Sequence, residues 1–269
     1  MCRGRALFAS VMVGAAVTLP AQELAGNSPP EAVIYLQNKP IDDTEDARRE
    51  ILELFDGLRV ADVSDGMDRV GLPDVGVMDR TIMPLWRDTE TMGHVLCGFA
   101  FTIRFLPTNR VPPNPHPEGD YMPYQRLWYG SIAASYWMDD LRDGDVMVVD
   151  AHQCGAGFMG SNNSIDWRTH GVRGVVTNDG PRDTDEIAAM RIPVYCATVN
   201  YGTNIGRVEL ESWNRPINCG GALVYPGDVI VADGDGVIVV PRERALEVGR
   251  LARAIHDEDE ASRAGKLEE

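Results

Sequence analysis

An arginine directly precedes an aspartate in the segment TNDGPRDTDEI, residues 177–187, a turn that follows a short apolar run. A guanidinium can grip a carboxylate through two parallel hydrogen bonds, and an aspartate can hold a hard divalent cation such as Mg²⁺. Arg182 is therefore a candidate anion-binding residue, and Asp183 is a candidate metal ligand. The structural alternative stays open, because Asp183 or Thr184 could simply cap the helix that starts here.

A second polar turn lies upstream, in VVDAHQCGAGFMGSNN, residues 148–163. Its glycines at positions 155, 157 and 160 let the backbone approach a ligand, and a helix that starts near Ser161 would aim its first N–H groups at an anion. The glycines also satisfy a GxGxxG pattern, but the acidic residue that dinucleotide binding needs should end a strand, and Asp179 lies in a turn. We therefore expect this turn to bind an anion other than a dinucleotide.

The segments around both turns alternate between strand and helix. Strands are predicted in DVMVVD, VRGVVT and IPVYCAT, and helices in LWYGSIAASYWMDDL, after Gly160 and in TDEIAAM. Such alternation indicates βαβ units around a parallel sheet that is buried on both faces. Ligands of open α/β sheets bind beyond the carboxyl ends of the strands, so the two turns should meet at one site.

Further elements flank this core. Helical spacing predicts a helix in DDTEDARREILELFDGL, capped by Asp43 or Thr44, and a short helix in VADVSDGMDRVG. LCGFAFTIRF, residues 96–105, indicates a buried β run, and the C-terminal third indicates two β runs joined by a Gly/Asp turn and then an amphipathic helix. The predicted fold class is α/β, with a parallel or mixed central sheet.

The chain is predicted to hold one globular domain behind an export signal. Residues 1–21 combine two arginines with a short apolar stretch and indicate a secretory signal peptide, so we expect an exported, periplasmic or secreted protein that is not membrane-bound after cleavage. Residues 22–42 form an extended lead-in, and 43–269 form the domain, with a proline-rich insertion at about 106–125. The net charge of −16 argues against nucleic-acid binding.

Six segments together carry a family resemblance: VADVSDGMDRVG, GDVMVVD, GSNN, HGVRGVVTNDGPRDTDEI, PVYCAT and YPGDVIVADGDGVIVVPRERA. Because these segments occur in the order and approximate spacing of the RraA-like family, the chain resembles that family over approximately residues 58–255. That family includes class II pyruvate aldolases acting on 4-hydroxy-4-methyl-2-oxoglutarate and 4-carboxy-4-hydroxy-2-oxoadipate, and the regulator of RNase E activity. The resemblance implies a β/β/α sandwich and a homotrimer or hexamer.

The resemblance also implies roles for individual residues. Gly160, Ser161, Asn162 and Asn163 would bind the carboxylate of a small 2-oxo or hydroxy acid, largely through backbone N–H groups. Arg182 would contact substrate oxygens, and Asp183 would hold Mg²⁺ or Mn²⁺, so that these two residues form the catalytic pair. The expected activity is metal-dependent cleavage or decarboxylation of a 2-oxo acid through a pyruvate enolate; the alternative is a non-catalytic binding or regulatory protein.

One position departs from the family pattern. The aldolases usually carry Asp or Glu where this chain has Ser161, and a neutral hydroxyl cannot replace a carboxylate base at neutral pH. Decarboxylation of an oxaloacetate-like acid needs the same enolate stabilisation but no base to start it. The serine should therefore impair decarboxylation less than aldol cleavage.

Overall fold

The computed structural model describes residues 41–110 and 121–267. The predicted signal peptide at 1–21, all but the end of the lead-in at 22–42 and the middle of the insertion at 106–125 lie outside these residues. Among the helices that are described, none has both the length and the apolar composition needed to cross a bilayer.

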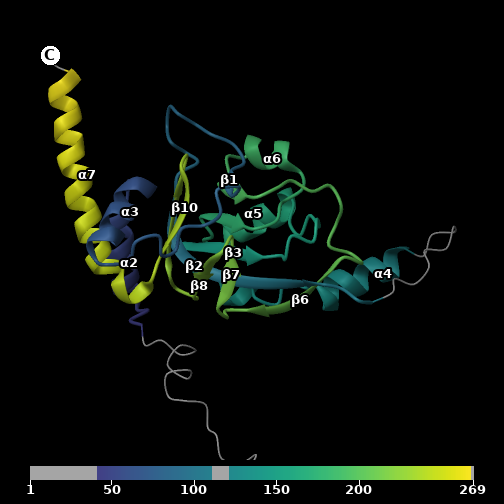
Figure 1. Ribbon diagram of the computed structural model, residues 1–269. Coiled ribbons are helices and arrows are strands. Elements are labelled where there is room, and N and C mark those ends of the chain that lie inside the picture. The colour runs from purple at the N-terminus through teal and green to yellow at the C-terminus, as the bar shows by residue number, and fades with distance from the viewer. Residues whose placement is uncertain (1–40, 111–120, 268–269) are drawn as a thin grey trace, which may run out of the picture. The chain divides into compact units, whose positions relative to one another are not determined.

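An eight-stranded mixed sheet forms the centre of the domain, in the order β1-β5-β4-β3-β2-β9-β10, with β6 also paired to β2 (Figure 1). The pairs β2–β3, β3–β4 and β4–β5 run parallel. The other pairs of this sheet run antiparallel. The predicted α/β class with a mixed sheet is thus confirmed. The strands are β1 (Met83–Pro84), β2 (Leu96–Pro107), β3 (Asp145–Asp150), β4 (Gly174–Thr177), β5 (Val194–Cys196), β6 (Val208–Trp213), β9 (Val229–Asp233) and β10 (Gly236–Val240), and a separate hairpin holds β7 (Ile217–Cys219) and β8 (Ala222–Val224).

The middle of strand β3, residues 146–149, is an unbroken apolar run between two aspartates. All six of its residues are buried. Because successive side chains of a strand point to opposite faces, Val146 and Val148 pack in one apolar cluster, while Met147 and Val149 pack in another. A strand covered on both faces has no solvent side, which accounts for the run of valines.

Three helices pack together beside β9 and β10: α2 (Glu45–Phe55), α3 (Val60–Arg69) and α7 (Ala245–Leu267) (Figure 1). The Thr44 hydroxyl caps α2 by accepting the Ala47 N–H at 3.3 Å, as one of the two predicted caps. Asp62 of α3 is buried, and its carboxylate bonds to the Arg59 guanidinium and to Nδ1 of His256 on α7. This ion pair network ties α3 to α7.

The helix predicted across LWYGSIAASYWMDDL is wrong as a single element. The chain instead forms α4 (Tyr121–Leu127), a π-helical turn at Trp128–Ile132 and a 3₁₀ turn at Met138–Asp140. At about 100° per residue, a straight helix would point Trp128 and Trp137 in opposite directions. Both indoles are buried in the same cluster, so the chain must leave the helix between them.

The structure describes both ends of the predicted insertion at 106–125. Strand β2 continues to Pro107, beyond the predicted run at 96–105, and α4 begins at Tyr121. The extension of β2 has a partner, because Phe105, Leu106 and Pro107 pair with β6. The sequence near residues 105–107 could not predict this pairing, because β6 lies about 100 residues further along the chain.

Candidate active site

The two polar turns leave neighbouring parallel strands at the same edge of the sheet. Val149 near the end of β3 is in register with Thr177 at the end of β4. Isolated bridges then join Gly157 of the first turn to Gly180 of the second and to Thr203. The predicted meeting of the turns at the carboxyl ends of the strands is confirmed, and further backbone hydrogen bonds hold them together, such as Arg182 N–H to Met159 O at 2.9 Å.

Asp179 of the second turn bonds to the first turn and to the loop after β5. Its carboxylate accepts the Gly155 N–H at 3.2 Å and the Asn200 side-chain amide at 2.6 Å, and the residue is fully buried. Burial raises the pKa of this carboxyl, although the hydrogen bonds from Asn200 and Gly155 act in the opposite direction. Sequence reasoning treated Asp179 only as a turn residue, because nothing in the spacing shows that one carboxylate serves two distant loops.

Asp183 directly precedes helix α6 (Thr184–Ala189) at the N-cap position, but its side chain makes no capping bond to that helix. The residue is left-handed, with φ 56° and ψ 38°, a conformation that is uncommon for residues other than glycine and turns its carboxylate away from the α6 N–H groups. Its Oδ2 accepts the Ser161 N–H at 3.2 Å, and its two oxygens lie 3.3 and 3.4 Å from Nε of Arg182. The structural alternative of a side-chain cap is therefore wrong for Asp183.

Gly160 is required by the close approach of this carboxylate. A Cβ atom at position 160 would lie 2.3 Å from Oδ2 of Asp183, inside any acceptable contact distance. Helix α5 (Ser161–Thr169) starts at the next residue, and its first intrahelical bond runs from Ser164 N–H to Gly160 O. The N–H groups of Asn162 and Asn163 thus belong to the first turn, where a helix offers donors to an anion.

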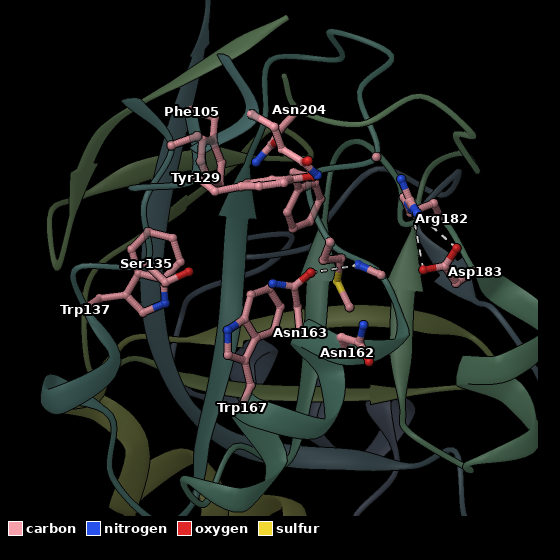
Figure 2. A pocket seen from close by; sticks show the side chains of 16 residues that line it. Phe105, Tyr129, Ser135, Trp137, Asn162, Asn163, Trp167, Arg182, Asp183 and Asn204 are labelled. Atoms are coloured by element: carbon pink, nitrogen blue, oxygen red, sulfur yellow. Dashed lines mark hydrogen bonds and ion pairs between the residues drawn. The ribbon is translucent and has the colours of Figure 1, made fainter. Parts of the chain in front are cut away.

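A cavity of about 410 Å³ opens beside this arrangement (Figure 2). Of the predicted site residues, Gly160, Asn162, Asn163, Arg182 and Asp183 line it. Ser161 does not: it is 8% exposed, and its N–H is bonded to Asp183. Five of the six predicted residues therefore meet at one cavity, and the sixth supports the carboxylate through its backbone.

Sequence reasoning missed the opposite wall of the cavity. Figure 2 shows Tyr129, Ser135 and Trp137 across the cavity from the Arg182–Asp183 pair. The full wall consists of residues from β2, from α4, from the segment between α4 and β3, and from the loop before β6: Phe105, Gln125, Tyr129, Ala133, Ser135, Trp137 and Asn204. Burial raises the pKa of the Tyr129 phenol, while Arg182 and hydrogen bonds with Thr203 and Gln125 act to lower it.

Comparison with known families agrees with the motifs. A model of the RraA-like family, described as Aldolase/RraA, matches residues 60–239. The chain belongs to the RraA-like family. A protein of Halalkalibacterium halodurans named "Putative 4-hydroxy-4-methyl-2-oxoglutarate aldolase" is 33% identical over 135 residues, which cover 49% of this chain and 62% of that protein. The RraA-like chain thus matches less than two thirds of that relative's length.

Solved structures share the RraA-like fold. RraAS2 of Streptomyces coelicolor, described as an unusual member of the RNase ES inhibitor RraA protein family, superimposes with a TM-score of 0.64 at 21% identity, covering 80% of this chain and 97% of that one. A structure described under novel cellulases from microbes associated with the gut ecosystem gives a TM-score of 0.70 at 23% identity, over 89% and 99% of the two chains. At these identities the likeness establishes the fold alone.

The RraA-like site has a donor set that suits a hard cation held by one protein carboxylate. Over residues 41–110 and 121–267, no three His, Cys, Asp or Glu side chains are grouped as a metal site. Mg²⁺ does not need such a group, because it keeps several waters and accepts substrate oxygens. The Asp183 side chain is 32% exposed at the cavity, where waters can complete the coordination of an ion.

Proposed function

We propose that this RraA-like protein is a carbon–carbon lyase that cleaves or decarboxylates a small 2-oxo acid. The observation that supports it best is the convergence of Arg182, Asp183 and the first turn of α5 on one cavity. These three features supply a cation, a metal-binding carboxylate and backbone donors. An oxo acid presents the complementary groups, which are a carboxylate and a neighbouring carbonyl oxygen.

Arg182 and the α5 N-terminus would bind and orient the acid. The Nε of Arg182 is only 3.3 Å from the Asp183 carboxylate, while the guanidinium lines the cavity. Its remaining N–H donors can therefore bind substrate oxygens while Asp183 keeps the side chain in place. The N–H groups of Asn162 and Asn163 would bind the carboxylate at the positive end of the helix dipole.

Asp183 would hold a divalent cation, Mg²⁺ or Mn²⁺. When bound, such an ion supplies Lewis-acid stabilisation of negative charge that develops on a carbonyl oxygen. Gly160 leaves room for the carboxylate, and the Ser161 N–H fixes one of its oxygens at 3.2 Å. Arg182 adds a second positive charge on the same side of the cavity, which favours the enolate left by C–C cleavage.

Decarboxylation is the better-supported half of the proposal. Ser161 stands where the aldolases usually carry an acid, and it does not line the cavity. The carboxylate at the site, Asp183, is assigned to the metal and to Arg182. When an oxaloacetate-like acid loses the carboxylate on carbon 3 as CO₂, the electron pair of the broken C–C bond would form the pyruvate enolate without prior proton removal. Water would then protonate carbon 3 of that enolate.

Pyruvate release from oxaloacetate and from hydroxy-oxo-diacids, with Mg²⁺ or Mn²⁺ present, tests this function. We expect Asp183→Asn to lower the rate by about 10²-fold or more, since it removes the metal-binding charge and part of the oxyanion stabilisation. Asp185→Asn is the matched control, because Asp185 lies on the same helix turn but does not line the 410 Å³ cavity.

Two outcomes would contradict the proposal. Activity that survives Asp183→Asn unchanged would refute the proposed site. No activity on any oxo acid, together with no divalent-metal binding by calorimetry, would favour a non-catalytic binding protein that keeps the fold.

A further inference from the structure

The cavity offers few groups that could give or take a proton. Among the described residues that line it, the titratable side chains are those of Tyr129, Arg182 and Asp183. A guanidinium is not deprotonated in a protein, and the proposed function assigns Asp183 to the metal ion. Ser161, where the aldolases usually carry an acid, does not line the cavity. The phenol of Tyr129 is therefore the group that remains for proton transfer.

Tyr129 belongs to the far wall of the cavity, across from the Arg182–Asp183 pair (Figure 2). The residue is 44% exposed, so its side chain is open to a molecule bound in the cavity and to solvent. Burial of the rest of the side chain raises the pKa of the phenol above its ordinary value. The phenol is thus protonated at neutral pH and can donate.

A tight turn holds Tyr129 at this wall. The π-helical turn Trp128–Ile132 is closed by the Ala133 N–H, which donates to Trp128 O at 2.8 Å. The indole of Trp128 is buried, and its N–H donates to Val208 O at 3.0 Å. Single π-helical turns of this kind are frequent at functional sites. Because its neighbour in the chain is fixed through both backbone and side chain, Tyr129 is held in place.

The surroundings of the phenol also favour its deprotonated form. Against the effect of burial, the charge of Arg182 and hydrogen bonds with Thr203 and Gln125 act to lower the pKa of Tyr129. A β-bridge joins Thr203 to Gly157, and a Cβ atom at position 157 would lie 3.1 Å from Cβ of Arg182. The loop that holds Thr203 is therefore a neighbour of Arg182. One cation and two hydrogen-bonding side chains would stabilise a phenolate until it is protonated again.

We infer that Tyr129 is a catalytic acid that delivers a proton to carbon 3 of the pyruvate enolate. The inference rests on the proposed function for the enolate, and it adds the group through which water protonates that carbon. The O–H bond of Tyr129 breaks as the C–H bond at carbon 3 forms, and the enolate oxygen becomes the carbonyl oxygen of pyruvate. The phenolate then takes a proton from water, so that solvent supplies one proton in each turnover.

Decarboxylation of 3-methyloxaloacetate in D₂O tests this role through the configuration of the product. The product is 2-oxobutanoate with deuterium at carbon 3, and an acid fixed on one wall reaches only one face of the enolate. Reduction with NADH and lactate dehydrogenase traps this product, and NMR of the 2-hydroxybutanoate should show one configuration at carbon 3 of the monodeuterated molecules. Tyr129→Phe should give both configurations in equal amounts, since D₂O then reaches either face.

Exchange of the methyl protons of pyruvate into D₂O, with Mg²⁺ present, tests the same step in reverse without any C–C cleavage. Tyr129→Phe should lower the exchange rate by about 10²-fold or more. Tyr136→Phe is the matched control, because it removes the same hydroxyl from an exposed residue that does not line the cavity. Its exchange rate should equal that of the unmodified full chain, and melting temperatures check that both variants are folded.

The outcomes separate this inference from the proposed function. Three results would each overturn the inference: both configurations in equal amounts from the unmodified protein, pyruvate exchange no faster than with Mg²⁺ alone, or a Tyr129→Phe variant that keeps its selectivity and exchange rate. The lyase proposal would stand after any of them if pyruvate is still released from oxaloacetate. Pyruvate exchange that depends on Tyr129, without pyruvate release from any oxo acid, would support the role of Tyr129 and contradict the lyase proposal.

Discussion

Substituting alanine for Gly160 tests whether the position of the Asp183 carboxylate matters. The added Cβ would lie 2.3 Å from Oδ2 of Asp183, whereas ordinary contacts begin at 3.4 Å. The carboxylate must therefore move by about 1 Å, and misplacement on that scale can lower a catalytic rate by about 10²-fold. It would also lose the Ser161 N–H, which now lies 3.2 Å away.

The same substitution should affect stability only mildly. Position 160 has φ −142° and ψ −167°, an extended conformation that alanine adopts without strain. A charge-assisted hydrogen bond that is lost at a partly exposed site costs about 1–2 kcal/mol, and the lower backbone entropy of alanine in the unfolded chain returns roughly 0.4–1 kcal/mol. The melting temperature should therefore fall by no more than about 6 °C.

The assay pairs activity with metal affinity. Pyruvate release from oxaloacetate and Mn²⁺ binding by calorimetry should both weaken in Gly160→Ala. Gly130→Ala is the control, because Gly130 has an ordinary φ and no atom within 4 Å of an added Cβ. Metal affinity and rate equal to those of the unmodified protein in a folded Gly160→Ala variant would refute the argument that this close approach positions the carboxylate.

Two further predictions concern stability. Hydrogen bonds from Arg59 and His256 outweigh the burial that would raise the pKa of Asp62 and instead lower that pKa to about 2. Asp62→Asn should therefore lower the free energy of unfolding by about 2 kcal/mol at pH 7, as measured by urea unfolding. This difference from the unmodified protein should disappear as the pH falls from about 4 to 2, because the Asp62 carboxylate is then protonated. A difference that stays constant with pH would exclude the charge of the carboxylate as its source. Asn204→Leu, which removes an unpaired buried acceptor, should raise the melting temperature by about 2–8 °C, and a lower value would show that Asn204 has a structural partner.

The residues that local sequence patterns could predict are those whose roles depend on their neighbours in the chain. The alternation of strands and helices gave β3, β4, β5, α5 and α6, and the position of both polar turns followed because parallel strands end at one edge. Arg182 and Asp183 could be chosen as a pair because they are adjacent. The turn glycine Gly160 was chosen for backbone approach, and the structure shows the atom that approaches it.

The far wall of the cavity depends on contacts between distant parts of the chain. Phe105 and Trp137 pack edge to face with centroids 6.2 Å apart, although they come from β2 and from a segment predicted to be helical. The segment has helical spacing, but one straight helix could not bury Trp128 and Trp137 in the same apolar cluster, and the chain breaks the helix to bury both. Asp179 was missed for the same reason, since its partners Gly155 and Asn200 lie on either side of it in other loops.

The pairing of β2 sets a constraint on how the chain acquires its structure during synthesis. Leu96 at its start pairs with Ala232 of β9, and Phe105 near its end pairs with Leu210 of β6. A nascent chain released only as far as β5 would hold β2 with just β3 beside it, leaving the opposite edge of an apolar strand without its partner. Such edges promote intermolecular association, so the ribosome-bound intermediate should depend on chaperones until β9 emerges.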